Sequence, residues 1–267
     1  MIYKKIKFGS KYQANIYIDN NGTLEGEERY IRNLVKEKPL VDLWTGKYRT
    51  WLIKHLRGHM YGSNPIETGN FDTEKTLKII ESTLKKCVNV LPPPKPINVF
   101  VFRSFNRFIL EKLYGSSGFA PMKNFLFLYI VPSSDLSAFL PMTVAHEYNH
   151  AVRFNYAEWI NLSDSLISEG LAQKFAEHIA GGHELMARVL TEKRALDIFK
   201  KLTSKQLSSR GSEIYNELFF EDKEYSLWAG YSIGYHLVNL FLKTNKKFTW
   251  KDITKVKSKD IIHGTTY

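Results

Sequence analysis

Residues 125–152 read FLFLYIVPSSDLSAFLPMTVAHEYNHAV, an apolar strand followed at once by a helix that carries two histidines. The strand, 125–131, is apolar without alternation, which is typical of a strand covered on both faces in the middle of a sheet. The turn residues of 132–135 end it, and the sequence predicts a long helix over about 136–156. This strand-turn-helix unit indicates a fold of mixed α and β structure.

The helix contains the pattern His-Glu-x-x-His at positions 146–150. His146 and His150 are four residues apart, so both imidazoles lie on one helix face, one turn from each other, and can meet one ion. Glu147 lies beside them, where its carboxylate would contact a metal-bound water instead of the metal. Chance produces this pattern only about 0.02 times in a chain of this composition, although a surface histidine pair would give the same letters.

A catalytic zinc normally takes three protein ligands and leaves the fourth position for water. The segment between His150 and Glu169 has 168 − 150 = 18 residues, and Glu169 lies near the start of an amphipathic helix predicted over about 164–180. The apolar stripe of that helix can pack on the first helix while Glu169 projects toward the metal. A carboxylate in this position is also favoured by the helix dipole alone, so both interpretations stay open.

These residues resemble the glutamate-zincins, the thermolysin-like and aminopeptidase clans, and the spacing of eighteen residues is that of the aminopeptidases. Together with LSDSLISEGLAQKFAEHIAG at 162–181 and WAGYSIGYHLV at 228–238, the stretch resembles the YjaZ-like family of predicted bacterial zinc-dependent proteases. The resemblance is clear from about 98 to 238. It implies an α+β zincin-like metallopeptidase fold, one zinc per chain held by His146, His150 and Glu169, and Glu147 as catalytic base.

The chain departs from the family pattern at two positions. Gln173 follows Gly-Leu-Ala where members often carry an acidic residue, and Asn149 stands where some carry histidine. The ligand set is intact, but no supporting role is carried over to these two positions. Asp164 has two interpretations, because it can cap its helix or orient a ligand imidazole through the free N–H.

A peptidase needs a donor for the oxyanion that develops on the scissile carbonyl. Tyr231 is the first choice and Tyr235 the second, since both lie on a predicted helix over about 231–243 without charged neighbours. Aromatic residues at helical spacing also pack into cores, so the alternative is that both rings only fill space.

The rest of the chain divides into three parts. Residues 1–71 form a poorly readable amino-terminal segment, mostly helical, with helices near 27–36 and 47–57 and a strand near 14–18. Residues 72–156 form an α/β subdomain with a helix up to the prolines at 92–94, a strand at 97–102 and a short helix at 105–114. Residues 157–267 form a helical subdomain that carries the third ligand.

Composition limits the other function classes. The chain has 267 residues and a net charge of +11, with one cysteine, Cys87, which excludes an intrachain disulfide and a cysteine-rich zinc site. The basic residues are spread out and no nucleic-acid motif accompanies them, so no specific nucleic-acid partner is expected. Neither a signal peptide nor a membrane-spanning stretch is recognisable, and the cytoplasm is the expected location.

We therefore expect a zinc metallopeptidase acting on a peptide or protein substrate. The alternative is a non-catalytic, zinc-stabilised regulator that keeps the motif for folding and binds an acidic partner. Glu147 discriminates between the two, because a purely structural site has no need of a carboxylate beside a metal-bound water.

Overall fold

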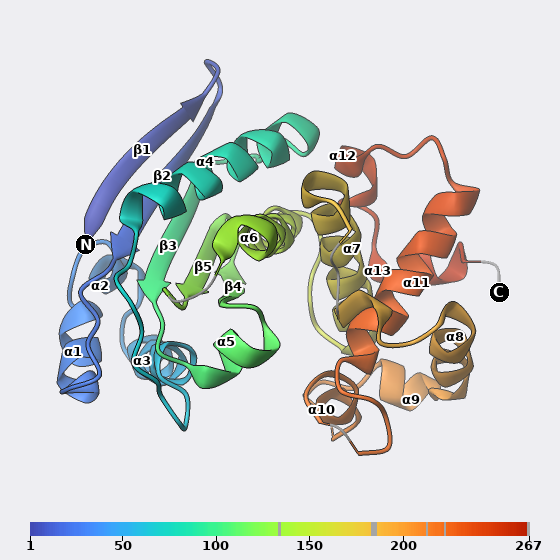
Figure 1. Cartoon of the computed structure of the whole chain (residues 1–267). Coiled ribbons are helices and arrows are strands. Elements are labelled where there is room, and N and C mark those ends of the chain that lie inside the picture. Colours follow the sequence, from blue (N-terminus) through green and yellow to red (C-terminus); the bar gives the residue numbers. More distant parts are fainter. Residues whose placement is uncertain (133–134, 183–185, 212, 222, 266–267) are drawn as a thin grey trace.

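Two apolar segments rich in β-branched and aromatic residues, 97–103 and 125–130, form the centre of a five-stranded sheet. The computed structural model describes residues 1–132, 135–182, 186–211, 213–221 and 223–265. Figure 1 shows the sheet with its helices in one half of the molecule and a half made of helices beside it. The strands are β1 (Ile2–Phe8), β2 (Tyr12–Asp19), β3 (Ile97–Arg103), β4 (Ser116–Met122) and β5 (Phe125–Ile130).

The helices divide between the two halves. Those of the sheet half are α1 (Glu27–Leu34), α2 (Leu40–Leu43), α3 (Lys47–Met60), α4 (Thr73–Val90), α5 (Arg107–Lys112) and α6 (Leu136–Arg153). The helical half contains α7 (Leu162–Ala180), the 3-10 turn η1 (Met186–Arg188), α8 (Glu192–Lys201), α9 (Ser204–Leu207), α10 (Glu213–Phe219), α11 (Ala229–Thr244), α12 (Trp250–Ile253) and α13 (Ser258–His263). The α+β class expected from the sequence is confirmed.

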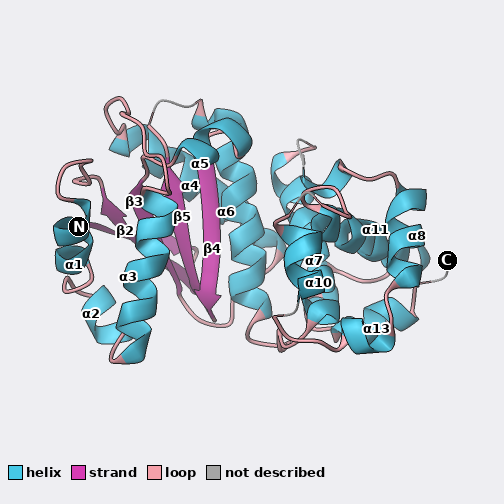
Figure 2. Ribbon diagram, turned by 90° about the horizontal axis from the view of Figure 1, so that it is seen from below, coloured by secondary structure: helices cyan, strands magenta, loops and turns pink. Residues whose placement is uncertain are grey.

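The strand order in the sheet is β1-β2-β3-β5-β4. The strands β2, β3 and β5 run parallel, whereas the outer strands β1 and β4 run antiparallel to their neighbours. The edge strand β4 is irregular, because its register with β5 shifts between Phe119 and Met122. Figure 2 shows β4 lying next to α6, so the helix with the two histidines runs along this edge of the sheet.

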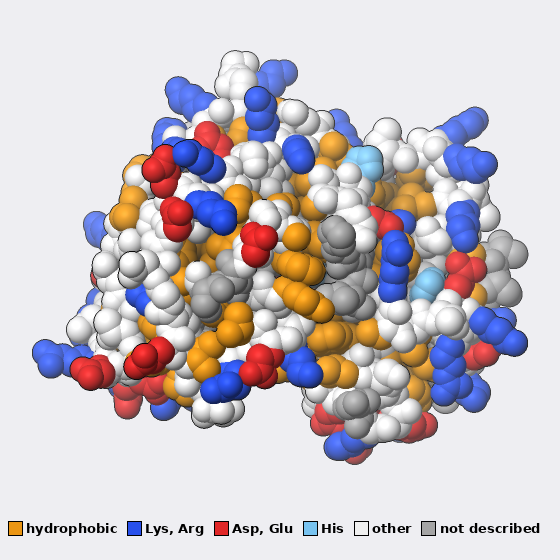
Figure 3. Space-filling view, in the orientation of Figure 1, with side chains coloured by type: hydrophobic (Ala, Val, Ile, Leu, Met, Phe, Trp, Pro, Cys, Tyr) orange, Lys and Arg blue, Asp and Glu red, His pale blue; other side chains and the backbone are white. Residues whose placement is uncertain are grey.

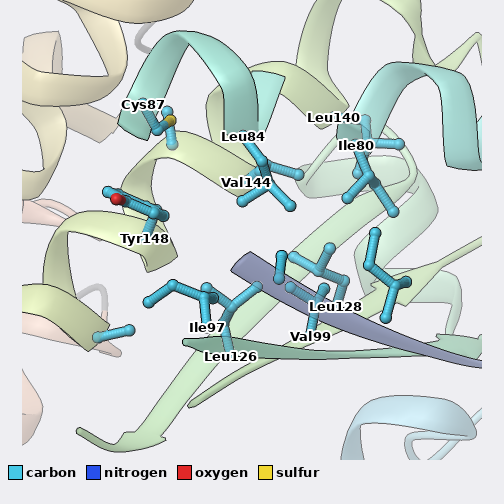
Figure 4. Close-up of a cluster of buried hydrophobic side chains, with 14 of the residues drawn as sticks. Ile80, Leu84, Cys87, Ile97, Val99, Leu126, Leu128, Leu140, Val144 and Tyr148 are labelled. Carbon is cyan, nitrogen blue, oxygen red and sulfur yellow. The ribbon is translucent and has the colours of Figure 1, made fainter. Parts of the chain in front are cut away.

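The two faces of the sheet carry different side chains. Aliphatic residues such as Val99 and Leu128 pack against α4 and α6 in the cluster of Figure 4, which also buries Cys87. The opposite face is aromatic and packs against α1 and α3 through Phe100, Phe102, Phe127 and Tyr129. Because β5 is covered on both sides, its run of apolar residues does not alternate, as the sequence predicted.

His55 and His59 of α3 lie against this aromatic face. The ring of His55 packs on Phe119 of β4 at 4.5 Å between centroids, and the ring of His59 stacks on Tyr129 of β5 at 4.7 Å. Burial lowers the pKa of His55 to about 3 and that of His59 to about 4. Both imidazoles are therefore neutral in the folded protein near pH 7.

In the sheet half, two strands and one short helix, β1, β4 and α2, were not predicted from the sequence, and in the helical half the short helices α10, α12 and α13 were not predicted. Lysines at positions 4, 5 and 7 hide the apolar alternation of β1, and Gly118 and Pro121 make β4 look like a loop. Edge strands tolerate such residues because only one side of the strand has to pair. The segment before residue 72 therefore contributes two strands of the sheet as well as helices.

In the helical half, α7 packs against α6 on one side and against α11 on the other. The core of this half is formed by apolar residues of α7, α8, α10, α11 and α13. Its long helices fit the ranges expected at 164–180 and 231–243. The sequence also predicts shorter helical pieces over 184–205, where the structure has η1, α8 and the start of α9; residues 184 and 185 of that range lie outside the described part of the chain. Over the described residues, the structure contains no helix with the length and apolar character needed to cross a bilayer.

Candidate metal centre

The helix α6 carries the two histidines on the side that meets α7. Its amino terminus is fixed by Asp135, whose carboxylate accepts a hydrogen bond from the backbone N–H of Ser137. One turn separates His146 from His150, and their Nε2 atoms lie 3.0 Å apart. Two imidazole nitrogens so close together can face a single ion.

Glu169 comes to the same point from α7. Its Oε2 lies 3.1 Å from Nε2 of His146 and 3.3 Å from Nε2 of His150. One ligand atom from each of the three side chains lies within 4.8 Å of the others. In the described part of the chain, this is the only set of three or more histidine, cysteine, aspartate or glutamate side chains close enough to hold a metal.

The charge states of these groups suit a metal. Burial lowers the pKa of His150, so its imidazole is neutral and keeps a free lone pair. Burial alone would raise the pKa of Glu169, but the contacts with His150 and His146 outweigh it and lower the pKa to about 2. Two imidazole nitrogens and one carboxylate oxygen are a donor set that zinc accepts, and they leave a fourth position open. The residues present therefore fit a catalytic zinc.

Glu147 points from α6 toward the edge strand β4. Its Cγ lies against Gly118 so closely that an ideal Cβ at that glycine would be only 2.3 Å away. The backbone N–H of Ala120 hydrogen-bonds the carboxylate. Burial raises the pKa of Glu147 to about 7, with the Glu169 charge adding to the rise and His146 and Ala120 opposing it. A carboxylate with this pKa takes up and releases protons near neutrality.

The two tyrosines selected from the sequence occupy different surroundings, although one helical turn separates them on α11. Burial raises the pKa of Tyr231 well above its usual value, and the charges of Glu169 and Glu147 add to the rise. The hydroxyl of Tyr235 instead donates to the carboxylate of Glu177 at 3.0 Å. Tyr231 therefore lies within electrostatic reach of the metal centre, whereas Tyr235 is bonded to a carboxylate two turns farther along α7.

A third tyrosine, Tyr215 of α10, was not selected from the sequence. Burial raises its pKa to about 12, and the charge of Glu169 contributes to the rise. The ring of Phe219 lies between the two tyrosines, 4.9 Å from Tyr215 and 5.2 Å from Tyr231 between centroids. No spacing rule links α10 to the histidines, so the sequence held no signal for this residue.

The approach of Tyr231 to the metal centre depends on a close crossing of α7 and α11. An ideal Cβ at Gly170 would lie 2.1 Å from the carbonyl oxygen of Gly234. An ideal Cβ at Gly234 would lie 1.9 Å from the carbonyl oxygen of Leu166. The two backbones therefore touch directly, and Gly170 is the residue next to Glu169.

The sequence left the roles of Asp164, Asn149 and Gln173 open, and the structure shows where each of them lies. Asn161 is the N-cap of α7, and the carboxylate of Asp164 completes a capping box by accepting from the backbone N–H of Asn161 at 3.4 Å. Asp164 is therefore neither the N-cap itself nor seen to orient an imidazole. Asn149 and Gln173 are both buried, in α6 and α7 respectively.

Figure 3 shows a notch in the lower outline of the molecule between the sheet half and the helical half. Hydrophobic side chains lie along it, and α5 and α10 stand on its two sides in Figure 1. Phe108 of α5 and Phe220, which follows α10, are 48% and 58% exposed. Exposed aromatic side chains of this kind are typical of surfaces that bind apolar groups.

A protein family and a curated relative are similar to this chain. A family described as "Predicted Zn-dependent protease (DUF2268)" matches residues 76–263, a range that includes His146, Glu147, His150 and Glu169. The uncharacterized protein YjfC of Bacillus subtilis (strain 168) is 30% identical over 172 residues, which are 59% of this chain. The match covers 56% of that relative, so the chain spans about half the length of the curated relative.

Proposed function

Because the chain belongs to this family of predicted Zn-dependent proteases, we propose that it is a zinc metallopeptidase that hydrolyses peptide bonds. His146, His150 and Glu169 would hold one zinc ion per chain. When bound, the zinc supplies a Lewis acid that lowers the pKa of a water molecule and polarises a carbonyl group. The proposal is supported above all by the meeting of two imidazole nitrogens and one carboxylate oxygen beside a second, protonatable carboxylate.

Glu147 is the general base in this proposal. Its pKa of about 7 means that the carboxylate is partly ionised at neutral pH and accepts a proton from the attacking water. The same oxygen then returns the proton to the leaving amine. The contact with Gly118 and the hydrogen bond from Ala120 hold the carboxylate in one place. The carboxylate is therefore already oriented before the reaction, which lowers the entropy cost of reaching the transition state.

Tyr231 is the donor for the developing oxyanion. Its raised pKa keeps the phenol protonated throughout the neutral range, so the hydroxyl is able to donate a hydrogen bond. Tyr235 is less suited to this role, because its hydroxyl already donates to Glu177. The exposed aromatic side chains Phe108 and Phe220, one in each half of the molecule, favour apolar side chains in a peptide substrate.

The alternative, a non-catalytic zinc-stabilised regulator, accounts for the three ligands but not for Glu147. A buried carboxylate whose ionised form is disfavoured costs stability, and a structural zinc site gains nothing from it. Glu147 therefore favours the enzyme.

The decisive experiment compares the wild type with Glu147→Gln and Glu169→Gln. Glutamine has nearly the shape of glutamate and hydrogen-bonds water, but it does not take up a proton at neutral pH. Glu147→Gln should therefore keep its zinc and its melting temperature while hydrolysis falls by about a hundredfold or more. Glu169→Gln loses an anionic ligand, so it should bind zinc more weakly as well.

The measurements are zinc content by elemental analysis, melting temperature, and the cleavage of one substrate found in a peptide library. Glu177→Gln is the matched control, because Glu177 lies on the same helix but binds Lys174, Arg188 and Tyr235 instead of the histidines. Full activity in Glu147→Gln would contradict the mechanism. Zinc loss in Glu147→Gln would contradict the ligand set.

A further inference from the structure

Arg153, the last residue of α6, is buried with 3% of its surface exposed and holds three separate segments together. Its Nε donates to Oγ of Ser168 in α7 at 3.3 Å. Its Nη1 donates to the backbone carbonyls of Thr254 at 3.0 Å and Val256 at 3.1 Å. Its Nη2 donates to Oγ of Ser258 at 3.3 Å. Four of the five N–H groups of the guanidinium are therefore used.

All four acceptors are uncharged. Among the described residues, no carboxylate oxygen forms an ion pair with Arg153 within 4.0 Å. The charge of Asp164 acts on Arg153 without forming an ion pair, and burying a guanidinium without a directly paired carboxylate is costly, so packing alone would be served better by an apolar side chain. The flat guanidinium is, however, the one side chain that spans three segments with fixed geometry, since lysine offers a single point charge.

The contacts of Arg153 lie next to the metal centre on both ligand helices. On α6, Arg153 follows His150 by three residues and so lies about one turn beyond it. On α7, Ser168 directly precedes Glu169. A hydrogen bond between Arg153 and Ser168 therefore fixes the two helices against each other at the level of the ligands.

We propose that Arg153 is a positioning residue of the metal centre, which couples residues 254–258 to the two ligand helices and keeps Glu169 within reach of His146 and His150. The proposal rests on the zinc site proposed above. It means that zinc binding and the order of residues 254–258 stabilise each other, because a coupling between two sites acts equally in both directions.

Arg153→Met tests the coupling, since methionine fills much of the space and removes all four hydrogen bonds. Ser168→Ala removes only the contact with α7, and Ser258→Ala removes only one contact with the carboxyl-terminal segment. Arg103→Met is the matched control, because Arg103 also joins distant segments. Arg103 is the last residue of β3, and its guanidinium donates to the Thr68 carbonyl and hydroxyl and to the Gly69 carbonyl.

Zinc affinity is measured by competition with a coloured chelator, and hydrogen–deuterium exchange is followed at residues 254–258 with and without zinc. Zinc should slow exchange in this segment of the wild type. Arg153→Met should weaken zinc binding by about tenfold or more, the scale seen when groups that orient ligands are removed, and should abolish the effect of zinc on the exchange. Ser168→Ala and Ser258→Ala should show smaller changes in the same direction, and Arg103→Met should show neither.

Zinc affinity in Arg153→Met equal to that of the wild type would overturn the proposal, as would an equal loss in Arg103→Met. If Arg153→Met does not fold, the two serine variants decide in the same way. A wild-type chain that binds no zinc would overturn both this proposal and the proposed function. A wild-type chain that binds zinc, with all variants unchanged, would overturn this one alone.

Discussion

Replacing Gly118 by alanine is expected to slow hydrolysis by about a hundredfold while leaving the metal in place. The new Cβ would lie 2.3 Å from Cγ of Glu147 and 2.9 Å from its Cδ and Oε1. Carbon atoms without a bond between them settle at about 3.5 Å or more, so the carboxylate of Glu147 has to move by about 1 Å. A misplacement of about 1 Å costs on the order of a hundredfold in rate. Gly118 does not have a positive φ, so alanine fits the backbone without strain.

The assay is kcat/KM on one peptide substrate, together with zinc content and melting temperature. Ser117→Ala is the control, because position 117 pairs with Tyr129 and its side chain projects from the opposite face of β4. We expect the control to behave as the wild type, and Gly118→Ala to keep its zinc and lose about a hundredfold in kcat/KM. Wild-type kcat/KM in Gly118→Ala would refute the assignment of Glu147 as the base held by β4.

Two further predictions concern the tyrosines and the neutral histidines. Tyr231→Phe should lower kcat by about a hundredfold at unchanged zinc content, whereas Tyr235→Phe should lower only the melting temperature, because it loses the bond to Glu177. Steady-state kinetics and calorimetry separate the two, and unchanged turnover in both would place the oxyanion donor elsewhere. His55 and His59 have folded pKa values of about 3 and about 4 against 6.5 when unfolded, so the unfolded chain binds more protons between these values. The contribution of these two histidines to the free energy of unfolding is therefore fully present above about pH 6.5. The free energy of unfolding falls as the pH drops toward 4, by about 2 kcal/mol for each histidine at pH 5. Urea unfolding at pH 7 and pH 5 measures the loss, and His55→Phe should remove about half of it; the same loss in His55→Phe as in the wild type would exclude this origin.

The sequence predicted best what a single helix determines. His146, Glu147 and His150 follow from helical geometry, and the structure brings the two imidazoles together as the spacing requires. Glu169 also lies beside the histidines, as predicted. Its prediction rested on the eighteen residues that separate it from His150, a spacing known from similar families that spans the connection between the two helices. The unbroken apolar run of β5 was readable for a similar reason, since burial on both faces leaves only one kind of side chain.

Features that depend on packing between distant segments were not predicted. Tyr231 and Tyr235 lie on one helix with similar neighbours in sequence, and only their tertiary surroundings separate their roles: Tyr231 feels the charges of Glu169 and Glu147, whereas Tyr235 donates to Glu177. Gly118 lies in the edge strand β4, which was not recognised as a strand because its sequence contains a glycine and a proline. Arg153 binds carbonyl groups 101 and 103 residues later, a distance over which no local pattern carries information.

The direct contact between α7 and α11 has a consequence for tracing distant relatives. Ligand residues can be lost when an enzyme loses its activity, but the crossing at Gly170 and Gly234 leaves no room for a Cβ on either helix. A relative that keeps this arrangement of helices must therefore keep glycine at both places, whether or not it still binds a metal. The pair, counted from the position of Glu169 in each sequence, offers a marker of shared ancestry that is independent of catalysis.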